Sequence, residues 1–281
     1  MANGLMIKLS VAATDNTLPK IPVVLNNGSI VLVDNNKDMV NINSLKSNVD
    51  AATSGVVQVP LVNRAADYAS ALGINTPTVR IDVEYNKKIE LSQTTAKGGL
   101  HISVGASAGM TSAGAKISIA STIVSYLSAN RTHNMFASIW GRTTRAGNVG
   151  LQYPLNLGFN ANNNFITVNG GQTSSPGRGD LGVDRLGDTL TLGMFKATAA
   201  GPFNLRNAEQ SDIINPWIMS WSQLMSLPGD FVAPGFIVYR LYLEDLTVSG
   251  RTYAQAKADD DALYSYAITG RLAGDTWTNP S

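Results

Sequence analysis

Residues 236–266, FIVYRLYLEDLTVSGRTYAQAKADDDALYSY, contain the strongest strand signal in the chain. From Ile237 to Glu244 the sequence follows a period of two, which is typical of a strand that buries only one face. The period of two assigns the side chains to two faces, with Ile237, Tyr239, Leu241 and Leu243 on one and Val238, Arg240, Tyr242 and Glu244 on the other. We therefore predict a half-buried strand whose solvent-exposed face offers Arg240, Tyr242 and Glu244 to a partner.

A polar turn at residues 249–251 separates this strand from a predicted helix. Thr252 and Gln255 have the Thr-x-x-Gln spacing of a capping box, and the Ala-rich run that follows is expected to end near Gly270. The acidic run at residues 259–261 lies inside this helix, where consecutive side chains splay around the axis and do not converge on a cation. We interpret the run as a solvated helix face.

Composition narrows the classes of function. The chain has 281 residues, no cysteine, and 21 basic against 20 acidic residues. This balance provides no field to attract nucleic acid, and the lack of cysteine excludes disulfides, thiolate metal sites and a cysteine nucleophile. Residues 1–16 lack the pattern of a secretory signal, and no stretch approaches the roughly 18 apolar residues of a membrane span. We expect neither a nucleic-acid partner nor membrane insertion.

The rest of the chain reads mostly as short strands separated by Gly and Asn turns. Residues 78–91 alternate and are predicted to form a hairpin or a bulged strand, and residues 133–145 a second clear strand with Phe136, Ser138, Trp140 and Arg142 on one face. Residues 151–169 have the pattern of a hairpin. Residues 117–130 fit a helix by their spacing and a strand by their β-branching, and both alternatives stay open.

These signals predict a mainly β fold, an antiparallel β-sandwich or jelly roll with a short C-terminal capping helix. We place the start of the sandwich domain at residue 78, so that it covers residues 78–281. Residues 1–77 are expected to form an irregular docking region with short strands, including an edge strand or extended arm that contains Pro60. Other expected features are a short helix at 63–72, a long loop at 172–188, a strand at 189–196 and an amphipathic turn or short helix at 213–227.

Few residues carry candidate chemistry. His101 and His133 are the only imidazoles, and neither lies in a catalytic or zinc-binding motif, so we interpret both as structural or surface residues. The loop acids lack the spacing of a calcium site and have arginines beside them, namely Asp180, Asp184 and Asp188 with Arg178 and Arg185. We predict no catalytic, cofactor or metal site. Trp140 is expected in the core, whereas Trp277 is expected to contact a neighbouring domain or subunit.

Two of these stretches resemble the concanavalin A-like, laminin-G-like jelly-roll family. Residues 135–142, MFASIWGR, are similar to an early strand of that family, and residues 236–264 are similar to its closing strand, turn and capping helix. The resemblance spans residues 78–267 and implies the jelly-roll fold. The carbohydrate- and calcium-binding loop residues of the family have no match in this chain, so the resemblance does not imply those functions.

Together with Lys97, Gly98, Gly99, Leu100 and His101 and the tail at 273–278, the closing unit is also similar to structural proteins of tailed bacteriophages. This implies a tail, baseplate or fibre component that assembles in the host cytoplasm with other virion proteins and copies of itself. One alternative is a lectin-like module that binds a bacterial surface glycan or host receptor. A second is a polysaccharide-degrading enzyme that uses Glu84, Glu90 or Glu244.

Overall fold

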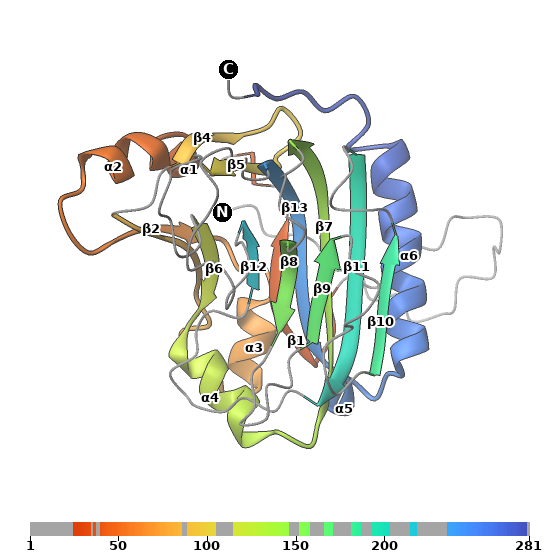
Figure 1. The fold of residues 1–281 in the computed structure, drawn as a ribbon. Coiled ribbons are helices and arrows are strands. Elements are labelled where there is room, and N and C mark those ends of the chain that lie inside the picture. The colour runs from red at the N-terminus through yellow and green to blue at the C-terminus, as the bar shows by residue number, and fades with distance from the viewer. Residues whose placement is uncertain are drawn as a thin grey trace.

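The structure is a computed structural model that describes most of the chain between residues 25 and 279. The described ranges are 25–34, 36–37, 40–85, 89–104, 115–145, 152–157, 166–170, 181–186, 193–202, 214–217 and 235–279. Their strands form sheets of seven, four and two strands, shown in Figure 1, and neighbouring strands pair antiparallel. The predicted mainly β class and the capping helix are confirmed.

The seven-stranded sheet is built around strand β13 (Gly235–Asp245). Its other strands, in spatial order, are β10 (Leu181–Leu186), β11 (Gly193–Pro202), β7 (Asn134–Arg145), then past β13 to β5 (Leu100–Val104) and β4 (Ile89–Thr94), with β1 (Ser29–Asp34) also paired to β13. Strand β7 pairs along one edge of β13. Strands β5 and β1 share the other edge, because β5 pairs with the first residues of β13 and β1 with the last.

The smaller sheets complete the β structure. The four-stranded sheet has the order β12 (Ile214–Trp217), β6 (Ala115–Ile119), β3 (Val79–Glu84) and β2 (Val56–Leu61), and the two-stranded sheet pairs β8 (Gln152–Leu157) with β9 (Ile166–Gly170). Because β2 ends its sheet and contains Pro60, the predicted edge strand is confirmed. The β8–β9 pair confirms the predicted hairpin.

Helices cover the sheets from several sides. They are α1 (Val40–Asn43), α2 (Leu45–Ala51), α3 (Ala66–Ala71), α4 (Ser121–Ala129), α5 (Leu246–Ser249) and α6 (Tyr253–Thr269). Helix α6 lies along one face of the seven-stranded sheet, and the four-stranded sheet lies on the opposite side (Figure 1). The alternatives for residues 117–130 are both partly right, since β6 ends at Ile119 and α4 begins at Ser121. The predicted short helix at 63–72 is α3.

The main apolar core contains side chains from both larger sheets. Val31, Ile81, Ile117 and Leu241 belong to one cluster and are completely or almost completely buried. The described part of the predicted docking region, residues 25–77, contributes β1, β2 and three helices, and several of its side chains lie in this core. Residue 78 is therefore not a boundary between two packing units.

Strand β13 contains a β-bulge that the alternating pattern does not reveal. Val238 pairs with Gly141 and Arg240 with Trp140, which leaves Tyr239 as an extra residue. Tyr239 and Arg240 therefore both face α6. Every residue of β13 is buried, so the prediction of a solvent-exposed face is wrong. The period of two identified residues of β13 that share a face, but it could not reveal that α6 covers this face.

Three other local predictions are corrected by the sheet topology. Strands β3 and β4 are both present but belong to different sheets, so residues 78–91 do not form a hairpin. Strand β10 falls inside the predicted loop at 172–188, and β12 inside the predicted amphipathic turn or short helix at 213–227. The strand expected at 189–196 is β11, which begins later, at Gly193, and continues to Pro202. Strand β12 pairs with β6, which lies far earlier in the sequence, whereas β10 pairs with the next strand, β11.

The predicted capping box is present at the start of α6. The Gln255 backbone N–H donates to Thr252 Oγ1 at 3.3 Å, and the Thr252 backbone N–H donates to Gln255 Oε1 at 2.8 Å. Thr252→Ala is expected to lower the free energy of unfolding by about 1 kcal/mol, because an N–H at the helix start loses its acceptor. Thr252→Ser is the matched control and should lose much less. Urea unfolding measures both, and equal losses would contradict a capping role.

Candidate functional site

The most highly charged part of the described interior lies between α6 and the seven-stranded sheet. Asp260 of α6 is 3% exposed. Ser138 Oγ and Trp140 Nε1, both from β7, donate to Asp260 Oδ2 at 2.8 Å and 3.2 Å. Arg240 of β13 pairs with Asp260 Oδ1, and Lys196 Nζ of β11 lies 3.0 Å from Oδ2. One carboxylate therefore contacts three neighbouring strands.

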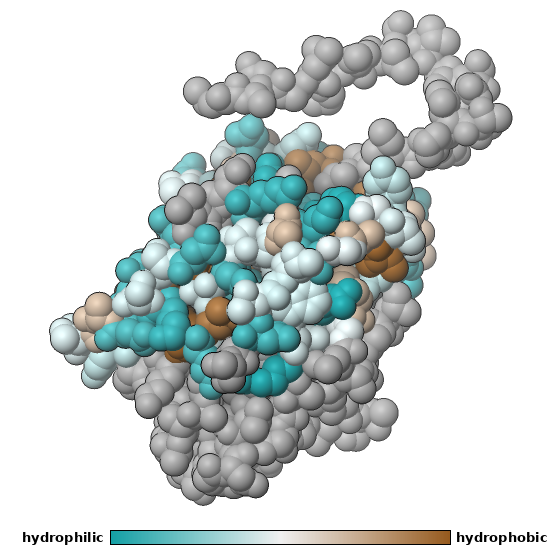
Figure 2. All heavy atoms as spheres, turned by 90° about the horizontal axis from the view of Figure 1, so that it is seen from above, coloured by the Kyte–Doolittle hydropathy of each residue, from teal (hydrophilic) through white to brown (hydrophobic). Residues whose placement is uncertain are grey.

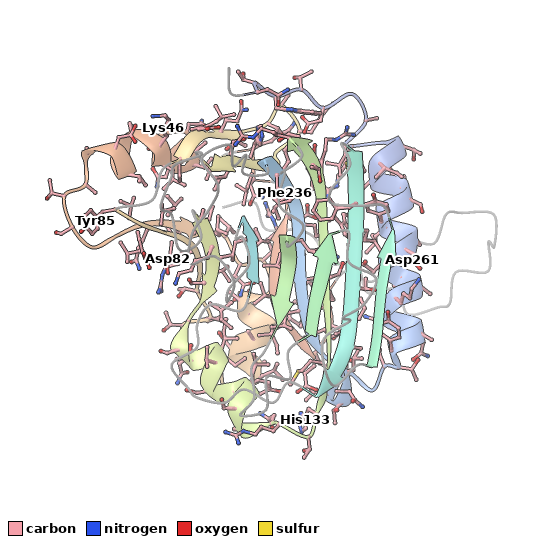
Figure 3. The ribbon with its side chains drawn as sticks, viewed as in Figure 1. Lys46, Asp82, Tyr85, His133, Phe236 and Asp261 are labelled. Carbon is pink, nitrogen blue, oxygen red and sulfur yellow. The ribbon has the colours of Figure 1, made fainter. Side chains whose placement is uncertain are left out.

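The two cations beside Asp260 have further partners. The Arg240 guanidinium lies 4.6 Å from the ring centroid of Trp140 and 4.8 Å from that of Tyr242, so cation–π contacts add to its ion pair. Lys196 is 3% exposed and also pairs with Asp261, which is labelled in Figure 3. Burial raises the pKa of the Asp261 carboxyl, but hydrogen bonds from Lys196 and Lys257 outweigh it and hold the pKa below its ordinary value.

A second group of charges lies at the far end of β13. Glu244 is completely buried and accepts hydrogen bonds from Tyr242 Oη and Asn26 Nδ2, both at 2.9 Å. Arg251 Nη1 lies 3.1 Å from Glu244 Oε2, and its Nη2 lies 2.8 Å from a carboxylate oxygen of Asp259. This arginine joins the strand to the first turns of α6.

These contacts correct the interpretation of residues 259–261 as a solvated helix face. The three carboxylates do splay around the helix, since the side chains of Asp259 and Asp261 are 45% and 43% exposed. Asp260 points inward, however, and each of the three forms an ion pair. The ion pairs of these three aspartates therefore hold α6 against the sheet.

The residues predicted to contact a partner lie elsewhere than expected. Arg240, Tyr242 and Glu244 are at most 3% exposed and contact α6 or β1 instead of solvent. Trp277 is half-buried: its ring lies 5.1 Å from the guanidinium of Arg142, and its Nε1 donates to Asn279 Oδ1. Trp140 is buried, as predicted.

An aspartate–histidine pair lies where β13 ends, with His133 directly before the start of β7. Asp245 is completely buried and accepts hydrogen bonds at Oδ2 from Tyr126 Oη at 2.7 Å and from His133 Nδ1 at 2.6 Å. His133 lies at the edge of the molecule in Figure 3. Such a pair orients a catalytic base in some hydrolases. In the described ranges no hydroxyl hydrogen-bonds to His133 Nε2, and the pair joins α4, β7 and β13.

The second histidine lies inside the sheet. His101 is completely buried in β5, with Gln93 Nε2 at 2.8 Å from Nδ1 and Thr144 Oγ1 at 2.8 Å from Nε2. Burial lowers the pKa of His101 to about 4. Because the Gln93 amide donates to Nδ1, the neutral ring carries its proton on Nε2 and donates to Thr144. His101 is therefore a structural hydrogen-bonding residue, as predicted.

The acids considered for an enzyme are not brought together. Glu84 ends β3, whereas Glu90 lies in β4 and pairs with Arg145, and Glu244 pairs with Arg251. Of the loop acids, Asp184 lies in β10, and Asp180 and Asp188 lie outside the described residues. Among the residues described, no group of three or more His, Cys, Asp or Glu side chains could hold a metal ion.

Sequence reasoning missed two residues that organise these clusters. Lys196 follows Phe195 in a strand, and only the distant acids on α6 explain why a lysine is buried there. Asp245 had a local signal, because an aspartate directly before a short helical turn is a typical N-cap. The Val248 backbone N–H does donate to its Oδ1, at 3.1 Å.

Comparisons with protein-family models, curated proteins and solved structures find no match to this chain. Within the described ranges, none of the helices combines the length and apolar character needed to cross a membrane. Function is therefore inferred from the residues of the chain itself.

Replacing the central carboxylate tests the importance of the ion pairs. Asp260→Ala leaves Arg240 and Lys196 buried without their shared partner, so we expect the free energy of unfolding to fall by about 3–5 kcal/mol. Asp259→Ala is the matched control on the same helix, and we expect a loss below about 1 kcal/mol because its ion pair is partly exposed. Chemical denaturation measures both. Similar losses for the two variants would contradict the central role of Asp260.

His101 is expected to make stability depend on pH. The unfolded chain binds a proton at the ordinary histidine pKa of about 6.5, whereas the folded chain does so only near pH 4. Acidification from pH 7 to pH 4.5 should therefore remove about 2 kcal/mol of folding stability through this residue. In His101→Gln the loss between these pH values should be smaller by that amount. Urea unfolding at both pH values measures it, and an equal loss in the two proteins would contradict the assignment.

Proposed function

We propose that this chain is a structural virion protein of a tailed bacteriophage, a component of the tail, baseplate or fibre. It assembles through protein–protein contacts with several symmetric copies of itself and with other virion proteins. The proposal includes the finer fold assignment, a concanavalin A-like jelly roll. It treats the chain as a non-enzymatic building block.

The observation that carries the proposal is the construction of the closing unit, on which the resemblance to phage structural proteins rests. Strand β13, the α5 turn and α6 follow one another directly in the chain and pack together. Its charged side chains, Arg240, Glu244 and Asp260, are buried in contacts within the chain. Buried ion pairs of this kind hold the strand and the helix in one fixed arrangement. Such rigidity suits a protein that must present the same surfaces in every copy.

The described surface supports a role in assembly. Figure 2 shows mainly polar side chains on one end of the molecule, with apolar residues scattered singly. Two exposed apolar side chains lie at the start of edge strand β2 and after its partner β3: Val56 is 49% exposed and Tyr85 is 44% exposed. An edge strand with exposed apolar residues is a common place for contact between protein chains.

The proposal predicts a defined multimer that is present in the virus particle. Mass photometry of the purified protein should give one species containing several copies, because closed symmetric assembly limits the copy number. Mass spectrometry of purified virions should detect the chain. A strictly monomeric protein that is absent from virions would contradict the proposal. A monomer that binds bacterial surface glycans on an array would favour the lectin-like alternative instead.

A further inference from the structure

The chain after α6 crosses the end of the seven-stranded sheet. Leu272 is 4% exposed and packs in a cluster with Trp140 and Tyr239, which fixes the chain at this point. Ala273 and Gly274 are exposed, and Gly274 has a φ of +65°, a value that favours glycine. Beyond this turn, residues 275–279, here called the tail segment, run over β7 toward β4 and β5 (Figure 1).

The first residue of the tail segment occupies a site built for a carboxylate. Tyr239 Oη donates to Asp275 Oδ2 at 2.7 Å, and the Lys97 backbone N–H donates to Asp275 Oδ1 at 2.8 Å. The tyrosine is almost completely buried and held by its neighbours. Gly99 keeps the loop close to it, because a Cβ at this position would lie 2.7 Å from Tyr239 Cε1. Both donors are therefore fixed in position by the folded sheet.

The following residues are held through their backbone. The Ala96 N–H donates to the Thr276 carbonyl at 3.2 Å. The side-chain amide of Gln93 binds both backbone groups of Thr278, donating from Nε2 to the carbonyl at 2.6 Å and accepting at Oε1 from the N–H at 3.3 Å. His101 fixes the orientation of that amide through Nδ1. Between these contacts, the Trp277 ring lies over Arg142.

The residues that hold the tail segment are here together called the tail groove: Gln93, Ala96, Lys97, Arg142 and Tyr239. They recognise a side-chain carboxylate, an extended backbone and an aromatic ring. Most of their contacts are hydrogen bonds at the surface, and residues 276, 278 and 279 are exposed. A short segment with so little buried apolar surface opens at a small cost in free energy compared with the whole fold.

We propose that the tail groove also accepts the tail segment of a second copy of this chain, so that two copies exchange their segments. The inference rests on the proposed function, because exchange is a means of joining copies. The same hydrogen bonds form in either arrangement, which makes exchange inexpensive. Asp275 comes three residues after Leu272, which is held in its own core, and three extended residues span about 11 Å. The carboxylate site of the second copy must therefore lie within that distance of Leu272 in a two-fold pair.

The absence of cysteine from the natural sequence allows a direct test in the full chain. Ala96→Cys is introduced in one preparation and Thr276→Cys in another that carries a different tag; both positions are exposed and adjacent across the groove. The two are mixed and oxidised, and the products are separated without reductant. We expect a disulfide-linked product with both tags. Ala96→Cys mixed with Ser265→Cys, an exposed position on α6, is the matched control and should give little of it.

Adding Asp275→Asn to the Thr276→Cys preparation should reduce the mixed product about tenfold, because the charged hydrogen bonds to Tyr239 and Lys97 are weakened. A mixed product no more abundant than in the control overturns the exchange. In that case a single chain that carries both Ala96→Cys and Thr276→Cys should cross-link only within itself. Mass photometry of the unsubstituted protein separates the two proposals. Multimers without the mixed product overturn exchange alone, whereas monomers at every concentration, in a protein that is also absent from virions, overturn both.

Discussion

The buried carboxylate of Asp260 is the contact on which the position of α6 depends. The apolar part of the helix face that meets the sheet is small, because its other buried residues are Ala256, Tyr264 and Ala267. Burying ions costs several kcal/mol each, so the ion pairs add less net stability than their number suggests. They do fix the register, because a helix shifted along its axis would leave Arg240 and Lys196 buried without a partner.

The bulge at Tyr239 is what brings these charges to the helix. In a regular strand, Tyr239 and Arg240 would point to opposite faces, and one of them would enter the main apolar core. The extra residue turns both toward α6, while Val238 and Leu241 remain in the core. The same bulge allows Arg240 to reach Asp260 and Tyr239 to reach Asp275. A local irregularity in one strand thus supports both the helix and the tail segment.

Local signals predicted the strand, the capping box and the end of α6, because each depends on residues within a few positions of one another. The same signals gave a wrong environment for Asp260, since its partners come from strands far away in the chain. Alternation in residues 78–91 was also ambiguous, because two strands that cross between sheets have the same period as a hairpin. The tail groove had no sequence signature, since its members become neighbours only when β13 lies between β5 and β7.

The closing unit is completed by residues from near the other end of the chain. Ser29 Oγ lies 2.8 Å from Tyr242 Oη, and the Asp245 backbone N–H donates to the Gly28 carbonyl at 2.8 Å. A Cβ on Gly28 would lie 2.3 Å from the Asp245 carbonyl oxygen, so the close approach of the chain before β1 to the end of β13 requires glycine at this position. The tail segment depends in turn on Tyr239 of the same strand. It is therefore the outermost layer of this series of contacts, and it can leave its groove without disturbing the pairing of β1 with β13.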